Sequence, residues 1–203
     1  MSVEFYRGWM NGDWLTHPAH AIAAAWIIWA LSWFVAAIWS RQTTQRASFA
    51  DEAPYRIVTA LGAFGLFGIL PVGQLDHQLY PIGDALLWMM FVIVVAGFSF
   101  CWWARLTLGA LWSGTVTRKE GHHIVDTGPY ALVRHPIYTG LLLAGFATAI
   151  ARGSVESFLG EALLILGCWM KARVEERFLS EQLGVEQYAA YRQRVHMLVP
   201  YLL

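Results

Sequence analysis

The stretch DTGPYALVRHPIYTG, residues 126–140, places hydrogen-bonding side chains directly before an apolar run. Pro136 suits the first turn of a helix, because its missing N–H would have had no intrahelical partner there. Arg134 and His135 would then stand at a helix N-terminus, where unpaired N–H groups and the positive end of the helix dipole bind carboxylates and phosphates. We predict a polar binding site at this point. The alternative is that these two residues cap a helix at the lipid headgroups.

A second group of charged residues lies in the stretch KARVEERFL. Lys171 and Glu175 are four residues apart, and Arg173 and Glu176 are three apart. The simplest interpretation is surface ion pairs, each worth about 0.2–0.5 kcal/mol. The alternative is that these side chains face the Arg-His pair across a polar pocket with both signs of charge. Such a pocket suits a zwitterionic, water-soluble cofactor that meets a lipophilic partner.

A helical hairpin would bring the two groups to the same end of the molecule. Residues 137–151 form its first apolar arm, ARGSVES forms the turn, and the second arm starts in residues 158–170. Helix formers continue this arm past the bilayer to Leu183, where Gly184 supplies a C-cap. Glu161 lies inside the second arm about one turn from its outer end, so we expect an interfacial or hydrogen-bonded structural role for it.

The composition indicates an integral membrane protein, because 57% of the 203 residues are hydrophobic and only 14% are charged, against about 25% in soluble domains. We predict an all-α, polytopic fold with about five transmembrane helices, three in residues 1–103 and two in a catalytic half, residues 104–203. The expected spans are residues 21–39, 57–72, 85–103, 137–151 and 158–170. Three are shorter than the roughly 20 residues that cross a bilayer, so they need polar helical extensions or local thinning. Gly62, Gly65 and Gly68 indicate close helix packing.

The distribution of charge predicts an orientation. Twelve of the fourteen Lys and Arg residues fall in the second, fourth and sixth segments outside the spans, and only Arg7 and Arg152 fall in the others. Because basic residues are retained in the cytoplasm, the N-terminus should lie outside and the C-terminus inside. The formal net charge of zero gives no attraction to nucleic acid, and we expect no metal site. Cys101 and Cys168 should be buried.

The stretches GHHIVDTGPYALVRHPIYTG, EERFL and LGVEQYAAYRQRV, followed by Pro200, together resemble the C-terminal half of the isoprenylcysteine carboxyl methyltransferase family. This family is related to the phospholipid N-methyltransferases, and the resemblance covers roughly residues 105–200. It implies an S-adenosylmethionine site at the cytoplasmic face, between the Arg-His-Pro loop and the Glu-Glu helix. The residues implied around the cofactor are His122, Tyr130, Arg134, His135, Tyr138, Glu175 and Glu176. The sequence has His196 where the family often has proline, and it lacks the glutamate run of the eukaryotic members.

The resemblance further implies methyl transfer to a lipophilic acceptor that enters from the bilayer. The acceptor would be the carboxylate of an isoprenylcysteine-like compound, a lipid or a small thiol. The candidate catalytic residues are Arg173, Glu176 and Lys171. Lys171 or Arg173 would orient a carboxylate acceptor without a general base, whereas Glu176 or His135 would take the proton of an amine or thiol. The chain resembles compact bacterial members, so we expect it in the inner membrane, among membrane lipids. Its active site should face the cytoplasm. The sequence does not indicate an oligomeric state.

Two other functions are consistent with parts of the sequence. Membrane NADPH-dependent sterol and enone-type reductases share a similar Arg-His-Pro and terminal Tyr-x-x-Tyr pattern. The paired glutamates nevertheless suit a cationic donor and would repel a polyphosphate. A non-catalytic membrane scaffold is the third possibility, and binding of any cofactor would count against it.

Overall fold

The computed structural model describes residues 17–40, 42–70, 75, 77–119, 123–183 and 185–200. The predictions for His122 and Gly184 fall outside these ranges. The helices are α2 (Pro18–Ala37), α3 (Phe49–Leu66), α4 (Asp84–Leu108), α5 (Pro136–Arg152), α6 (Val155–Leu183) and α7 (Val185–Arg194). Two 3-10 turns, η2 (Gly109–Leu111) and η3 (Gly128–Ala131), and two short strands, β1 (Thr43–Arg46) and β2 (Thr117–Lys119), complete the described part. The prediction of an all-helical fold is confirmed.

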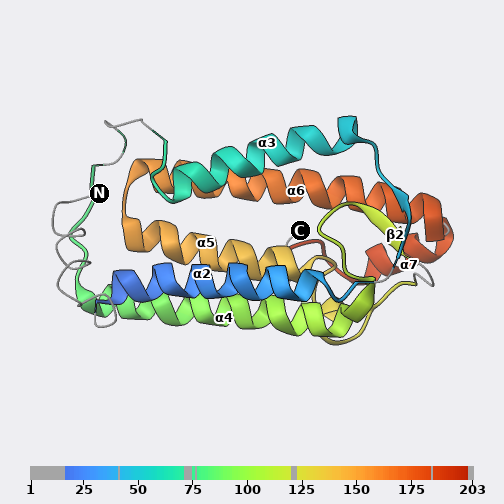
Figure 1. Cartoon of the computed structure of the whole chain (residues 1–203), viewed down its shortest axis with the longest axis horizontal. Helices are drawn as coiled ribbons and strands as arrows, with labels where there is room; N and C mark the ends of the chain where they lie inside the picture. The colour runs from blue at the N-terminus through green and yellow to red at the C-terminus, as the bar shows by residue number, and fades with distance from the viewer. Residues whose placement is uncertain are drawn as a thin grey trace.

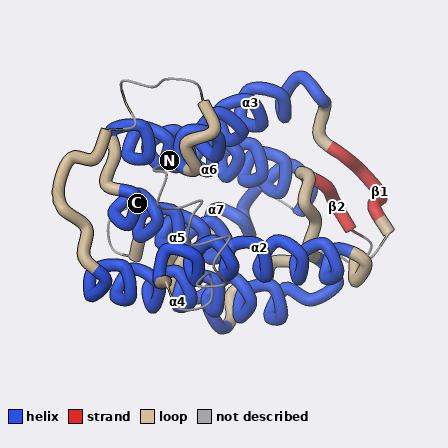
Figure 2. The backbone as a smooth tube through the Cα atoms, turned by 60° about the vertical axis from the view of Figure 1, so that its left-hand side comes forward, coloured by secondary structure: helices blue, strands red, loops and turns tan. Residues whose placement is uncertain are grey.

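The five long helices form an elongated bundle (Figure 1). Helix α3 packs along α6, α5 packs against both α6 and α4, and α2 packs on α4. The start of α5, the C-terminal part of α6, α7 and the strand pair all gather at one end of the bundle, which we call the α7 end (Figures 1 and 2). The predicted hairpin of residues 137–183 therefore brings its two groups of charged residues together.

Glycines allow α3 and α6 to approach at backbone distance. A Cβ placed on Gly62 would lie 2.7 Å from the Leu164 nitrogen, and one on Gly160 would clash with the backbone of Gly65. Close packing is confirmed for Gly62 and Gly65. Gly68 instead follows the helix with a φ of +66°, a left-handed conformation that favours glycine.

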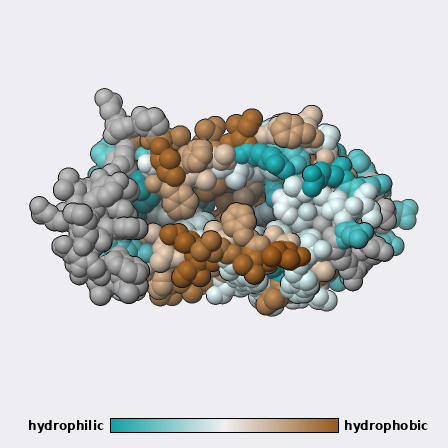
Figure 3. Space-filling model, viewed as in Figure 1, coloured by the Kyte–Doolittle hydropathy of each residue, from teal (hydrophilic) through white to brown (hydrophobic). Residues whose placement is uncertain are grey.

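Within the described ranges, two helical segments, Pro18–Ala37 and Asp84–Leu111, are long and apolar enough to cross a membrane, whereas Pro136–Arg152 is apolar but shorter. The first turns of α3 and the last turns of α6 carry charged residues. These two helices therefore lack an uncharged apolar stretch long enough to cross a membrane by itself. Large apolar side chains are nevertheless exposed on all five long helices, including Ile28, Ile57, Val92, Phe146 and Ile165. Figure 3 shows apolar residues over the middle of the molecule and hydrophilic residues toward the α7 end. Exposed apolar surface on this scale marks a membrane or protein contact.

Helix α3 begins eight residues before the predicted span. The Ser48 hydroxyl caps it by accepting a hydrogen bond from the Asp51 N–H at 3.2 Å, which satisfies one of the unpaired donors of the first turn. Glu52 and Tyr55 then turn inward and are buried. These polar first turns lie outside the apolar run and were therefore not part of the predicted span.

Helix α6 runs from Val155 to Leu183, so the predicted extension beyond the apolar run is confirmed. Glu161 is only 2% exposed, and its carboxylate lies against Gly145 of α5. It is therefore buried between two helices rather than interfacial. Cys101 and Cys168 are buried free thiols, as predicted.

Candidate functional site

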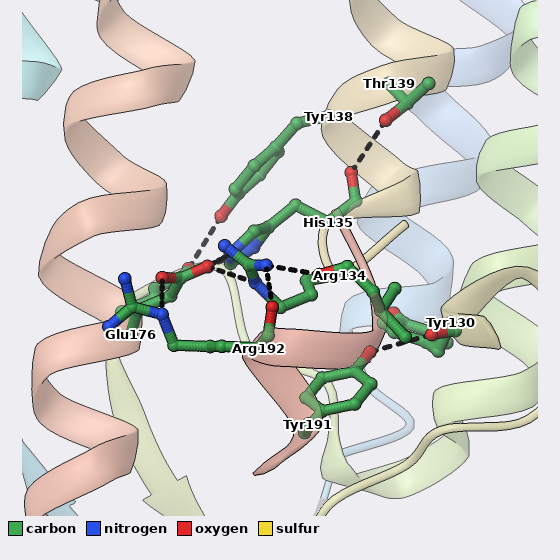
Figure 4. A network of polar contacts seen from close by, with 10 residues as sticks. Tyr130, Arg134, His135, Tyr138, Thr139, Glu176, Tyr191 and Arg192 are labelled. Carbon is green, nitrogen blue, oxygen red and sulfur yellow. Dashed lines mark hydrogen bonds and ion pairs between the residues drawn. The ribbon is translucent and has the colours of Figure 1, made fainter. Parts of the chain in front are cut away.

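Charged side chains from the start of α5 and the far end of α6 meet at the α7 end of the bundle (Figure 4). The Nε of Arg134 donates to Oε1 of Glu176 at 2.7 Å, and Nε2 of His135 lies 3.2 Å from the same oxygen. Nδ1 of His135 lies 3.4 Å from Oε2 of Glu175, and the Tyr138 hydroxyl donates to Oε1 of Glu175 at 2.6 Å. Both glutamates thus find hydrogen-bond partners on the facing segment, which rejects the interpretation of plain surface ion pairs within α6.

His135 occupies the N-cap position of α5, but its side chain makes no capping hydrogen bond. Its ring instead stacks on Tyr138, with centroids 5.4 Å apart and planes 6° apart, and it reaches both glutamates. The helix-cap alternative therefore does not account for His135.

The segment after α7 fixes the backbone of the Arg-His pair. The N–H of Arg134 donates to the His196 carbonyl at 2.8 Å, and that of His135 donates to the Met197 carbonyl at 3.0 Å. The hydroxyl of Thr139 donates to the carbonyl of Leu198 at 2.6 Å. We call residues 195–198 the tail. The tail forms a parallel bridge with the loop that precedes α5 and so positions the side chains that face α6.

The electrostatics of the network favour a charged histidine between two carboxylates. Burial alone would lower the pKa of His135, but hydrogen bonds and charge from Glu175 and Glu176 outweigh it and raise the pKa above 6.5. Burial would likewise raise the pKa of both glutamates. Hydrogen bonding to His135, with Lys171 near Glu175 and Arg134 near Glu176, instead lowers the pKa of each below 4.5. At neutral pH both carboxylates are therefore ionised.

A cavity of about 360 Å³ opens beside this network. Its polar end is lined by His135, Tyr138, Lys171 and Glu175. Its other end is aromatic and aliphatic, with Trp29, Trp33, Leu108, Leu111 and Trp112. The remaining wall includes residues 113–117, residues 123–125, Tyr130, Tyr188 and Tyr191. The cavity thus joins a charged compartment to an apolar one.

Glu175 and Glu176 have different positions in this arrangement. Glu175 lines the cavity and its side chain is 18% exposed. Glu176 is 3% exposed and lies behind the wall, where Nε of Arg192 is 3.3 Å from its Oε2. The structure therefore brings Tyr130, Arg134, His135, Tyr138 and Glu175 to the cavity, whereas Glu176 supports two of them from outside.

The two basic residues proposed for the acceptor side point in different directions. Lys171 lines the cavity, donates to the Gly114 carbonyl at 3.1 Å and lies 5.3 Å above the Tyr138 ring. Arg173 is exposed, lies 5.8 Å over the Trp169 ring and lines a separate hollow. Successive helix residues rotate by about 100°, so Arg173 is about 200° from Lys171 around α6. The structure does not bring Arg173 into the cavity.

A connecting segment that the sequence did not assign to the site forms part of its wall. We call residues 112–117 the strap. Glu52 of α3 is 3% exposed and accepts a hydrogen bond from the Val116 N–H at 2.9 Å, while Ser40 donates to the Trp112 carbonyl at 2.9 Å. These contacts, like the pairing of β1 with β2, join residues far apart in the chain and leave no local pattern.

The aromatic end of the cavity was also missed, although a signal for it existed. Trp29 and Trp33 are four residues apart, a spacing that puts both on one face of a helix. Trp33 meets Trp112 edge to face, with ring centroids 5.6 Å apart. Helical spacing could have paired Trp29 with Trp33, but it could not have supplied Trp112.

Comparison with known proteins finds a family model that matches the part of the chain carrying this geometry. Residues 88–180 match the model of the Isoprenylcysteine carboxyl methyltransferase (ICMT) family. That range contains the Arg-His pair, Tyr138, Lys171 and both glutamates, so the family resemblance drawn from the sequence is confirmed over both walls of the charged compartment.

The names of two curated relatives specify different methyl acceptors. Protein-S-isoprenylcysteine O-methyltransferase B of Arabidopsis thaliana is 31% identical over 88 residues, which are 43% of this chain and 44% of that protein. Methanethiol S-methyltransferase of a Pseudomonas species is 41% identical over 73 residues, 35% of this chain and 26% of the relative. The chain thus spans less than half the length of either relative.

Proposed function

We propose that this protein is an integral membrane methyltransferase that uses S-adenosylmethionine and acts on a lipophilic acceptor. The observation that carries the proposal is the ionised carboxylate of Glu175. It lines a cavity that joins a charged compartment to an aromatic one. Tyr138 and His135, which line the same cavity, hold this carboxylate in place, so it is already oriented for a cationic ligand.

The residues around the cavity fit the chemical groups of S-adenosylmethionine. Glu175 can accept hydrogen bonds from an ammonium group or from ribose hydroxyls, and a charge-assisted bond of this kind is among the stronger ones. Tyr130, Tyr188 and the strap offer flat and polar surface for a nucleoside. Bound there, the cofactor would supply a methyl group already activated on a positively charged sulfur. The protein then mainly has to align the acceptor and exclude water.

Lys171 is the residue that we assign to the acceptor side. Its ammonium lies in the cavity wall, between the strap and the Tyr138 ring, where it can attract a carboxylate or a thiolate. The two candidate bases are both engaged: two glutamates favour the charged form of His135, and Glu176 is buried against Arg134. This arrangement favours an acceptor that arrives as an anion.

We further propose five spans in the bacterial inner membrane, with the cavity at the cytoplasmic end. The α7 end holds Arg134, Lys171, Arg177 and Arg192, whereas Arg152 lies at the opposite end of α5. This asymmetry supports a cytoplasmic position for the cavity. Helices α3, α5 and α6 are the three proposed spans that are short or carry charges. Their exposed apolar side chains support a position in the membrane for each of them.

Ligand titration of the full chain in detergent tests the function. S-adenosylmethionine and its demethylated product S-adenosylhomocysteine should each raise the melting temperature, whereas NADPH should not. A ligand at 100 times its Kd adds about 2.7 kcal/mol to the free energy of unfolding. Stabilisation by NADPH alone would favour a reductase, and no response to any of the three would favour a scaffold.

A further inference from the structure

A hollow of about 290 Å³ on the outer surface of the bundle takes no part in the proposed reaction. It lies between the first turns of α3 and the part of α6 where the apolar run ends. Ala50, Asp51 and Pro54 line it from α3, and Trp169, Met170 and Arg173 line it from α6. Arg173 is one of the two basic residues that the sequence offered for the acceptor side, and the structure turns it outward.

Arg173 gives this hollow a cation with spare hydrogen-bonding capacity. Within the part of the chain that the structure describes, its guanidinium forms no ion pair and contacts the Trp169 ring at 5.8 Å. Trp169 is 44% exposed. An arginine beside an exposed tryptophan at the end of an apolar run is the arrangement expected at the membrane–water boundary.

The charges around the hollow sum to +1 when Arg177, which borders its lining, is counted with Asp51 and Arg173. A hydrogen bond from Ser48, together with Arg177, lowers the pKa of Asp51, so this carboxylate is ionised. It lies 2.8 Å from Nη2 of Arg177. The pair neutralises itself, and Arg173 remains to attract an anion.

Apolar side chains continue the hollow toward the middle of the bundle. Helical spacing puts Ile57 and Leu61 on the same face of α3 as Pro54, and Leu166 on the same face of α6 as Trp169 and Met170. Ile57 is 61% exposed, and Leu61 and Leu166 are each 43% exposed. The surface thus presents a charged head region followed directly by exposed apolar side chains.

We propose that this hollow binds an anionic phospholipid, with the phosphate at Arg173 and the acyl chains along the exposed faces of α3 and α6. The guanidinium fork matches phosphate oxygens and is weakly hydrated, so it suits a phosphodiester at a headgroup. The inference rests on the membrane position of α3 and α6 proposed above and is independent of methyl transfer.

Binding of a fluorescent phosphatidylglycerol to the full chain in neutral detergent tests the proposal. Unlabelled phosphatidylglycerol should displace the probe at lower concentration than phosphatidylcholine, and inorganic phosphate should not displace it. Arg173→Gln should weaken binding about fivefold, since a cation near an anionic lipid contributes about 1 kcal/mol. Arg173→Lys keeps the charge but loses the guanidinium fork, so it should retain only part of the affinity.

Arg46→Gln is the matched control, because Arg46 is an exposed arginine on β1 outside the hollow. An equal loss in Arg46→Gln and Arg173→Gln would show attraction to overall charge and overturn the proposal. Equal displacement by phosphatidylcholine would also overturn it, and displacement by phosphate alone would show an inorganic anion site instead. Arg173 is exposed, so we expect Arg173→Gln to leave the melting temperature unchanged. That result would exclude misfolding as the cause of the lost lipid binding.

Discussion

The two adjacent glutamates of α6 divide binding and support between them. Glu175 reaches the cavity, whereas Glu176 is buried and contacts Arg134, His135 and Arg192. Removing a buried carboxylate such as that of Glu176 leaves its cationic partners buried and unpaired. This costs more free energy than removing a carboxylate at the cavity, such as that of Glu175, where water can solvate the partners that remain. The pairing of these glutamates with the Arg-His pair could be predicted from the hairpin, but their division of roles depends on how α6 is rotated.

Glu175→Gln and Glu176→Gln should separate these roles. We expect Glu176→Gln to destabilise the fold by about 3 kcal/mol, because it uncouples a buried ion pair. Glu175→Gln should weaken S-adenosylmethionine binding about tenfold or more with a smaller change in stability, because it removes a charge-assisted hydrogen bond. Calorimetry and thermal unfolding measure the two effects. Glu181→Gln, an exposed position on the same helix, is the control, and the reverse ranking would contradict the assignment.

Lys171→Gln should slow methyl transfer more than Arg173→Gln, because only Lys171 lines the cavity. Its loss should raise the KM for an anionic acceptor and leave cofactor affinity nearly unchanged, and Lys171→Arg should restore part of the rate. Steady-state kinetics with the acceptor varied checks this. A larger loss in Arg173→Gln would return that residue to the acceptor side.

The charged network should make stability depend on pH in a predictable direction. The raised pKa of His135 stabilises the fold below pH 6.5, and this contribution is lost as the pH rises through the folded pKa. The lowered pKa values of Glu175 and Glu176 stabilise it above pH 4.5, and that contribution is lost as the pH falls through their folded pKa values. The network therefore contributes most between these two values.

His135→Gln should remove the alkaline part of this dependence. In the wild-type protein the melting temperature should fall as the pH rises above 6.5, and in the variant the fall should be smaller. Thermal unfolding across a pH series measures the difference. Parallel curves for the two proteins would mean that His135 is neutral in the folded state.

At the scale of elements, the sequence predicted the long helices because apolar runs are a local signal. Pro136 starts α5 as expected, and α6 ends near its predicted end at Leu183. The polar first turns of α3, the strap and the pairing of β1 with β2 were not predicted. They depend on contacts between distant residues, such as that of Glu52 with Val116, which no periodicity records.

The contact of α3 with α6 should be sensitive to a single methyl group. Gly160→Ala must push apart two backbones, because its Cβ would meet the main chain of Gly65 and Leu66. We expect a loss of about 1–3 kcal/mol despite the better helix propensity of alanine. Gly83→Ala is the control, since a Cβ there meets nothing within 4 Å. Thermal unfolding in detergent compares them, and equal stability would mean that the helices are less closely packed.

At the scale of the whole molecule, the ends of the bundle differ in chemistry. The α7 end carries the charged network, the strap and the strand pair, and the middle carries exposed apolar side chains (Figure 3). The alternation of basic residues along the sequence predicted this asymmetry, because each long helix reverses direction. Among the residues that the structure describes, only two helical segments are long and apolar enough by themselves, so the other three spans stay a prediction.

Cysteine labelling tests the predicted topology. Single cysteines at Gln45 and at Asp84 should react from opposite sides of the membrane, with Gln45 accessible only from the cytoplasm. The native Cys101 and Cys168 are buried, so their background reaction should be low. Labelling of the Gln45 position in intact cells would reverse the orientation, and labelling of both positions from one side would contradict the five-span arrangement.

The site can form only after the tail has been synthesised. The carbonyls of His196 and Met197 fix the backbone of Arg134 and His135, yet they are made some sixty residues after the pair that they hold. While a ribosome still shields residues 195–198, helices α2 to α5 can already be in the bilayer, but the charged wall of the cavity lacks its backbone support. Ligand binding during translation should therefore begin only when this segment is released, so that a nascent chain stalled before it stays inactive.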